Sequence, residues 1–141
     1  MPGGERLSRK NTKAEGDRWE VRIKQYMESI GFSVERAKPI LKRISGFWIS
    51  SSNDFFGASD HFCMKAGYDK LVFIQATTNL GQLSVKKKKQ ETVPWAPCCK
   101  VQIWIKSKSG TVRVFDRIGP MEYSEYIWRL KDGVEPPTGV L

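Results

Sequence analysis

The sequence predicts a single domain of the α/β class, a mixed central β-sheet flanked by helices. Three observations lead to this prediction: an amphipathic helix near the N-terminus, a β-hairpin near the middle, and a second hairpin that follows a short basic helix. At 141 residues the chain is long enough to bury one hydrophobic core. Its 40% hydrophobic and 28% charged residues are typical of globular rather than disordered proteins.

The first helix is predicted to begin at Asp17. Its apolar residues recur at spacings of three and four and form one stripe: Trp19, Ile23, Tyr26, Met27 and Ile30. Gly31 ends this helix, because glycine readily adopts the left-handed conformation of a helix C-terminus. Residues 1–16 are expected to form a flexible basic arm, and residues 32–37 alternate as a short strand.

The middle hairpin is the clearest element. Residues 60–65 and 70–77 flank the sequence AGYD, in which Gly67-Tyr68 suits a two-residue type II′ turn. In that register the numbers of paired residues sum to 135, so Asp60 faces Gln75. A four-residue loop centred on the same point would preserve this register. Cross-strand partners point to the same face, and Thr77 points the same way as Gln75. We therefore expect these polar residues to gather at one end of the hairpin.

A basic helix is predicted from Gln82 to about Thr92, ahead of Pro94. Residues 99–107 and 111–118 then alternate as a second hairpin around Ser109-Gly110. Residues 46–50 are compatible with a further strand.

Residues 121–130 are predicted as a final helix, because their apolar residues keep roughly helical spacing. The folded domain is thus expected to span residues 17–131. Residues 132–141 are expected to form a loose C-terminal tail.

The chain is strongly basic, with a formal net charge of +9. Its cations gather in residues 6–13, 38–43 and 86–89. This excess favours a polyanionic partner, most commonly nucleic acid, although a lysine run also occurs on solvated helix faces. No apolar run approaches the ~18 residues of a membrane helix, and the N-terminus does not resemble a signal peptide. We therefore expect a cytoplasmic protein with no membrane partner.

The three cysteines argue against a disulfide framework, because their number is odd and Cys98 and Cys99 are adjacent. Together with His61, the only histidine, they offer four zinc ligands in principle. Neighbouring cysteines chelate one tetrahedral ion poorly, and no C-x-x-C spacing is present. Buried, inert thiols are the favoured interpretation.

The Asp60–Gln75 pair has two interpretations. Polar side chains at the end of a strand commonly just emerge into solvent. The alternative is a metal site, which the surrounding motifs favour. The segment EVRIKQYMESIGF, with Arg36 after the Gly-Phe pair, and the segments NDFFGASD and FIQATT resemble the motifs of the archaeal-type and phage-borne Holliday junction resolvases. These enzymes belong to the PD-(D/E)XK nuclease superfamily, and the resemblance covers about residues 9–117.

The resemblance implies a restriction-endonuclease-like fold and metal-assisted phosphodiester hydrolysis. Asp60 takes the place of the invariant acid, Gln75 that of the second acid and Thr77 that of the motif lysine. Mg²⁺, for which Mn²⁺ substitutes, would be held by Asp60, Gln75 and the Ala76 carbonyl, with Glu20 completing the shell. Asp54 is a possible extra ligand. Because Thr77 carries no charge, Lys86 or a neighbour would supply the catalytic amine.

The resemblance also implies partners. Branched DNA, a four-way junction, would be bound through its phosphates by a set of cations: Arg9, Lys10, Lys13, Arg36, Lys86, Lys87, Lys88 and Lys89. A homodimer is expected, because two strands must be cut across a nearly two-fold DNA. Its apolar contact would come from Trp95, Trp104, Phe115 or Trp128, unless these form the core. The setting would be a prokaryotic or phage-infected cell.

The sequence is also compatible with other functions. A general or nicking nuclease of the same fold would share every motif. A catalytically degenerate DNA-binding module would explain Gln75 and Thr77, since neither residue is the charged one expected there. A plain architectural protein is disfavoured by the absence of wedge motifs and of a long basic helix.

Overall fold

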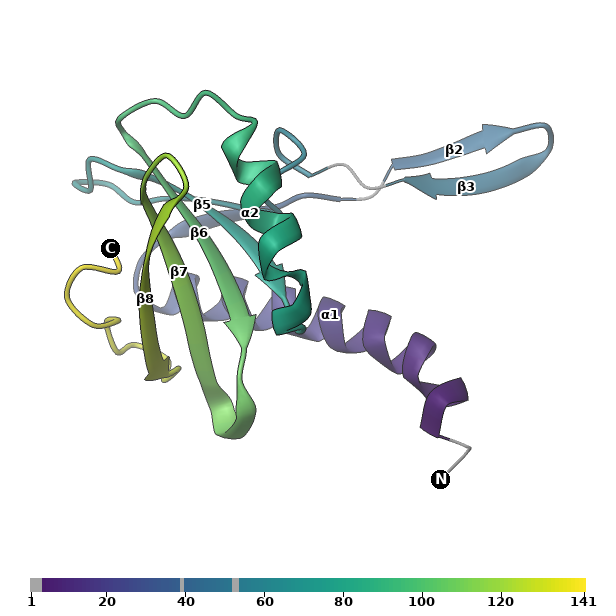
Figure 1. Ribbon diagram of the computed structural model, residues 1–141, viewed down its shortest axis with the longest axis horizontal. Helices are drawn as coiled ribbons and strands as arrows, with labels where there is room; N and C mark the ends of the chain where they lie inside the picture. Colours follow the sequence, from purple (N-terminus) through teal and green to yellow (C-terminus); the bar gives the residue numbers. More distant parts are fainter. Residues whose placement is uncertain (1–3, 39, 52–53) are drawn as a thin grey trace.

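The structure, a computed structural model, describes residues 4–38, 40–51 and 54–141 (Figure 1). Its two α-helices are α1 (Gly4–Ser29) and α2 (Leu83–Glu91). Its strands, in chain order, are β1 (Ser33–Arg36), β2 (Ile40–Ile44), β3 (Phe47–Ser51), β4 (His61–Met64), β5 (Leu71–Thr77), β6 (Cys99–Lys106), β7 (Thr111–Gly119) and β8 (Glu122–Arg129). The predicted α/β class with a mixed sheet is confirmed.

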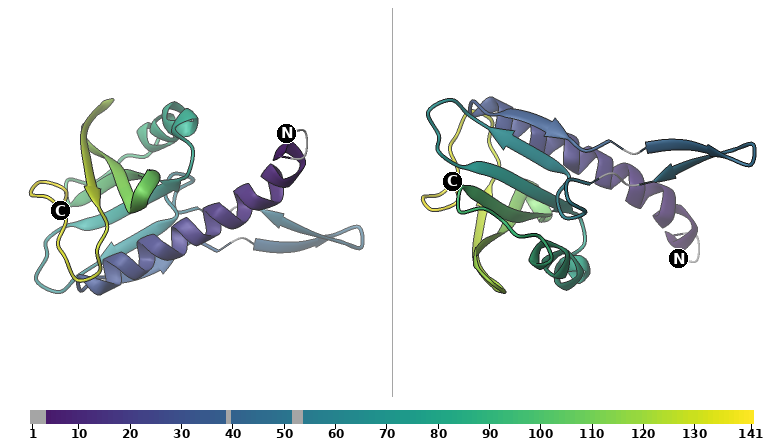
Figure 2. Two further views of the ribbon diagram at one scale, coloured as in Figure 1. Left: turned by 90° about the horizontal axis from the view of Figure 1, so that it is seen from below. Right: turned by 90° about the horizontal axis from the view of Figure 1, so that it is seen from above.

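Six of the strands form one sheet in the order β1-β4-β5-β6-β7-β8. Only β5 and β6 run parallel, and α2 connects them, since a parallel pair needs a crossover. All other neighbours are antiparallel. Helices α1 and α2 lie on opposite faces of this sheet (Figures 1 and 2).

Helix α1 covers one face with the apolar stripe predicted from the sequence. Trp19, Ile23, Tyr26 and Met27 are all buried against the sheet. The Trp19 indole donates to the Trp104 carbonyl at 3.1 Å, which fixes the helix across β6. The helix is longer than predicted. It begins at Gly4 and not at the predicted Asp17, so residues 4–16 are helical.

The register of the β4–β5 hairpin is the predicted one. His61 pairs with Ile74, Phe62 with Phe73 and Cys63 with Val72. The turn differs, because Tyr68 N donates to Lys65 O at 3.1 Å and Gly67 takes a φ of 81°. The type II′ turn at Gly67-Tyr68 is therefore wrong. The longer loop is centred on the same point, which preserves the pairing.

Residues 121–130 form a strand, β8, and not the predicted helix. Tyr126, Trp128 and Leu130 pack on the core, while the residues between them are exposed. This period of two is the signature of a strand, and tyrosine, isoleucine and tryptophan favour strands. Ile127, counted towards the helical stripe, is 61% exposed.

The C-terminal segment is packed and not loose. Val140 is fully buried, and its carbonyl accepts from Gln102 Nε2 at 2.5 Å. The Val134 carbonyl accepts from the Tyr26 hydroxyl at 2.8 Å. The segment therefore closes the edge of the core beside α1.

Strands β2 and β3 form a separate two-stranded sheet. Ile44 pairs with Phe47 across the two-residue turn Ser45-Gly46. Both turn residues have positive φ, 50° and 82°, as type I′ hairpins require. The hairpin projects away from the main sheet (Figures 1 and 2).

The cysteines differ in their surroundings. Cys63 is fully buried, and burial raises its pKa to about 12, which makes it an inert thiol as expected. Cys98 is exposed, so the expectation of burial is wrong there. In the described part of the chain, no helix is long and apolar enough to cross a membrane.

Helix α2 is fastened to β7 and β8 by Glu91. Its carboxylate accepts from Arg117 Nε at 2.6 Å and Arg117 Nη2 at 3.1 Å, and also from Met121 N and the Tyr123 hydroxyl. The Arg117 hydrogen bonds lower the pKa of Glu91 to about 2, against the opposing effect of burial. A bidentate arginine–carboxylate pair of this kind is among the stronger polar contacts in proteins.

We predict that Glu91→Gln lowers the free energy of unfolding by about 2 kcal/mol, measured by urea denaturation at pH 7. Because the pKa of Glu91 is lowered on folding, its contribution is complete above about pH 4.5 and is lost as the pH falls towards about 2. The difference between wild type and variant should shrink over that window.

Glu125→Gln is the matched control, because Glu125 pairs with Arg113 but both side chains are about a third exposed. An exposed pair contributes about 0–1 kcal/mol. Equal losses in the two variants would show that Glu91 does not anchor α2.

Candidate active site

Asp60 lies immediately before β4, with its backbone fixed on both sides. Ala37 N donates to Asp60 O at 2.9 Å, and Asp60 N donates to Ile74 O at 3.0 Å. These bonds hold the residue between the ends of β1 and β5. Its side chain is 6% exposed, so the carboxyl group belongs to the interior and not to a solvated strand end.

The carboxylate extends the β4–β5 ladder. Ala76 directs its peptide N–H towards β4, as every second residue of a strand does, but β4 begins only at His61. The Asp60 carboxylate accepts this otherwise unpaired N–H, at 3.1 Å to each oxygen. The Ala76 carbonyl receives only a long 3.5 Å contact from Gln75 Nε2.

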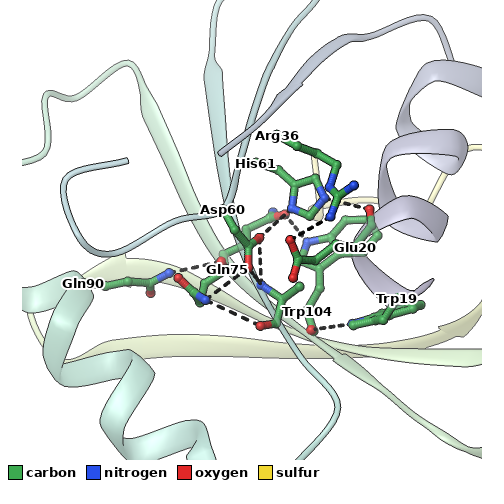
Figure 3. A network of polar contacts seen from close by, with 10 residues as sticks. Trp19, Glu20, Arg36, Asp60, His61, Gln75, Gln90 and Trp104 are labelled. Atoms are coloured by element: carbon green, nitrogen blue, oxygen red, sulfur yellow. Dashed lines mark hydrogen bonds and ion pairs between the residues drawn. The ribbon is translucent and has the colours of Figure 1, made fainter. Parts of the chain in front are cut away.

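Gln75 lies against Asp60, as the predicted register requires (Figure 3). Its Nε2 donates to Asp60 Oδ2 at 3.2 Å, and the side chain is 3% exposed. The Gln75 Oε1 atom is buried and finds no donor among the described residues. A buried acceptor without a partner costs about 1–3 kcal/mol, so this atom is a place where a ligand would be stabilised.

His61 connects Asp60 to helix α1 and was not predicted as a site residue. The ring is fully buried, with Nδ1 at 2.6 Å from Asp60 Oδ1 and Nε2 at 2.8 Å from the Glu20 carbonyl. A carbonyl only accepts, so Nε2 carries a hydrogen. The contact with Asp60 then needs a second proton, held either by Nδ1 or by the carboxyl group. In the sequence, the only indication that His61 belongs to the site is its position next to Asp60.

Glu20 points into the same region from α1 (Figure 3). Its carboxylate accepts from Arg36 Nη2 at 3.2 Å, and its side chain is 25% exposed. Burial raises the pKa of Glu20, the nearby charge of Asp60 raises it further, and Arg36 opposes both. Glu20 and Asp60 are thus close enough to repel each other, as two carboxylates at one cation site would.

Thr77 and Asp54 lie at the margin of this site. The Thr77 hydroxyl accepts from Asn79 N at 3.1 Å and donates to Asn79 O, so it is engaged in the turn that leads to α2. Asp54 begins the tight turn in which Gly57 N donates to Asp54 O at 3.1 Å. Neither side chain forms a hydrogen bond with Asp60.

Lys86 lies on the inner side of α2, half-buried with Leu83, Lys87 and the buried Gln90. Lys87 stands over the Phe115 and Tyr123 rings, so that flank of α2 faces β7 and β8. At about 100° per residue, Lys86 lies on the opposite flank of the Leu83–Gln90 line. In the sheet, β5 lies on the side of β6 away from β7, and it carries Gln75. No hydrogen bond or ion pair joins Lys86 to Asp60 or Gln75 in the described part of the chain.

The predicted phosphate contacts fall into two groups. Lys13, Lys88 and Lys89 are exposed, whereas Arg36 is held by Glu20 and Lys87 by the two rings. The side chains of Arg9 and Lys10 lie outside the part that the structure describes. The exposed cations are available to a polyanion, and the engaged ones are tied to the protein itself.

Of the residues named for a dimer contact, Trp104 and Phe115 belong to the core, 0% and 7% exposed. Trp128 packs against that core, and Trp95 lies on the Phe73 ring at 5.0 Å between centroids. All four side chains therefore pack within the protein, Trp104 and Phe115 buried and Trp95 and Trp128 partly buried.

The described residues contain no cluster of three or more histidine, cysteine, aspartate or glutamate side chains placed to hold a metal ion. A cation here would depend on amide and carbonyl oxygens beside Asp60. No family model matches the chain, and no curated protein matches it.

Proposed function

We propose that the protein is a structure-selective, metal-dependent endodeoxyribonuclease that resolves four-way DNA junctions. The observation that carries the proposal is the buried group formed by Asp60 and Gln75, with an unpartnered Gln75 Oε1, beside the half-buried Glu20. A carboxylate and an orphaned carbonyl oxygen, buried together in a protein of charge +9, are suited to a hard cation and a phosphodiester.

Mg²⁺ fits this donor set through Asp60, Gln75 and the Ala76 carbonyl, with Glu20 nearby. Because Gln75 Oε1 has no donor among the described residues, an ion beside it would supply the missing partner. When bound, the ion would offset the negative charge that develops on the scissile phosphate and promote attack by water.

Within this proposal the chain's own residues divide the remaining tasks. Ala76 N and His61 hold the Asp60 carboxylate in place, which limits the reorganisation needed on binding. The Lys86 amine, reaching from α2 towards β5, would stabilise charge on the phosphate. The exposed Lys88 and Lys89 would contact the DNA backbone without reading sequence.

The topology supports a restriction-endonuclease-like fold. A helix bearing Glu20 is followed by an antiparallel β1-β4-β5 unit, and β5 continues through α2 into the parallel strand β6. Asp60 and Gln75 lie on the central hairpin of that unit, where the resemblance requires them. A homodimer working on branched DNA in the cytoplasm belongs to the same proposal.

A catalytically degenerate DNA-binding module is the second candidate. It is favoured by the absence, among the described residues, of a three-carboxylate cluster, and by the engagement of Thr77 in its own turn. The two candidates separate in one assay. The nuclease cuts a labelled four-way junction when Mg²⁺ is added, whereas the module binds the junction and leaves it intact.

A further inference from the structure

The β2–β3 hairpin carries large apolar side chains into solvent at its tip. Phe47 is 72% exposed, Trp48 68% and Ile44 52%. Phe47 and Trp48 are consecutive residues of β3, so their exposed rings extend from opposite faces of the hairpin. Large exposed apolar side chains that gather in one place often mark a contact with a partner. The two-residue type I′ turn fixes the pairing register of both strands.

The same segment is basic. Residues 36–53 contain four cations, Arg36, Lys38, Lys42 and Arg43, and no acidic residue. Arg43 pairs directly with Trp48 across the hairpin, so the guanidinium and the indole share one face. Ile44 and Phe47 share the other face. Cations beside exposed rings favour a partner that is both anionic and aromatic, which describes nucleic-acid bases on their phosphate backbone.

The hairpin lies on the same side of the molecule as the N-terminal half of α1, and both extend beyond the main sheet (Figure 2). In the sequence the hairpin follows β1, whose Arg36 contacts Glu20. The segment after the hairpin leads to Asp60. The segments that flank the hairpin in the sequence therefore both adjoin the candidate site.

We propose that Phe47 and Trp48 stack on the base faces left uncovered where the arms of branched DNA meet. The hairpin would thereby select branched over linear DNA, since an intact duplex offers no such faces along its length. This inference rests on the proposed function, because it assigns the substrate selectivity of that site to the hairpin. Stacking tolerates any base, which agrees with selection by structure and not by sequence.

The test measures binding of a four-way junction and of linear duplex in EDTA by Phe47→Ala, Trp48→Ala and the double variant of the full chain. A 2-aminopurine at the branch point reports stacking by its fluorescence. We expect each single variant to bind the junction about tenfold more weakly, with little change for linear duplex, and to lose part of the fluorescence response.

Ile127→Ala and Met121→Ala are the matched controls, because both side chains are exposed apolar residues of the β8 region, 61% and 65%. They should leave junction binding unchanged. Equal junction affinity of the double variant and wild type would overturn the inference. So would a fall in sedimentation mass from dimer to monomer in the hairpin variants, because the tip would then bind a second copy.

Cleavage by the wild-type protein separates this inference from the proposed function. If the wild type cuts the junction and the double variant binds and cuts it equally well, the hairpin inference fails and the nuclease stands. If the wild type never cuts but the double variant loses junction binding, the nuclease fails and the stacking role stands.

Discussion

Asp60→Asn is expected to lower junction cleavage in Mg²⁺ by at least about 10³-fold, equivalent to ~4 kcal/mol of transition-state stabilisation. Asparagine keeps the shape and can still accept the Ala76 N–H. It loses the charge that a hard cation needs, and it offers His61 a weaker partner. Junction binding without metal should change little, so the effect should appear in cleavage rate and not in affinity. Gel-based cleavage assays with parallel binding measurements check this prediction.

Asp69→Asn is the control for the loss of one negative charge, because Asp69 is exposed in the β4–β5 turn. It should cut at the wild-type rate. Thermal unfolding of Asp60→Asn establishes that the variant folds. A folded Asp60→Asn protein that cleaves at the wild-type rate would remove Asp60 from any catalytic role.

Lys86→Ala is expected to lower the cleavage rate by about 10²-fold, the usual effect of removing one group that stabilises developing charge. The prediction depends on the position of this half-buried lysine, on the flank of α2 opposite to the one that faces β7 and β8. Single-turnover cleavage at saturating protein separates this effect on rate from an effect on binding.

Lys88→Ala is the matched control, an exposed lysine of the same helix. It should weaken DNA binding a few-fold and lower its salt dependence, while the single-turnover rate stays unchanged. If Lys86→Ala and Lys88→Ala behave alike, Lys86 is one of several phosphate contacts and the catalytic amine must be sought elsewhere.

The parts of the fold fixed by local patterns were predictable from the sequence. The α1 stripe from Trp19 to Ile30 follows helical periodicity. The β4–β5 register follows from the position of Gly67 and the alternation around it, even though the turn type was wrong. The predicted register places Asp60 beside Gln75, where the structure also has them.

The errors lie where tertiary contacts override local spacing. Met121, Tyr123, Ile127 and Leu130 have helical spacing, yet the edge of β7 offers hydrogen bonds that a helix there would leave unmade. The buried Val140 closes the core from a segment rich in proline and glycine, which composition alone marks as loose. Such contacts depend on where distant segments meet.

Two site features illustrate the same limit. His61 is visible in the sequence as the neighbour of Asp60, but its bridge to the Glu20 carbonyl depends on α1 lying over β4. For the β2–β3 hairpin the sequence indicated only a further strand at residues 46–50, and the pairing of that strand with residues 40–44 across Ser45-Gly46 was not predicted. The exposure of Phe47 and Trp48 could not be predicted, because strand periodicity does not show whether another element packs on a given face of the strand.

Metal-dependent junction resolution is tested by cleavage of a labelled four-way junction by the wild-type protein in Mg²⁺, with linear duplex of the same sequence as the comparison. The proposed function predicts paired, symmetric cuts across the branch point in the junction only, abolished by EDTA. Tight junction binding with no cut in either Mg²⁺ or Mn²⁺ would contradict it, and would leave the Asp60–Gln75 pair as part of a DNA-binding module.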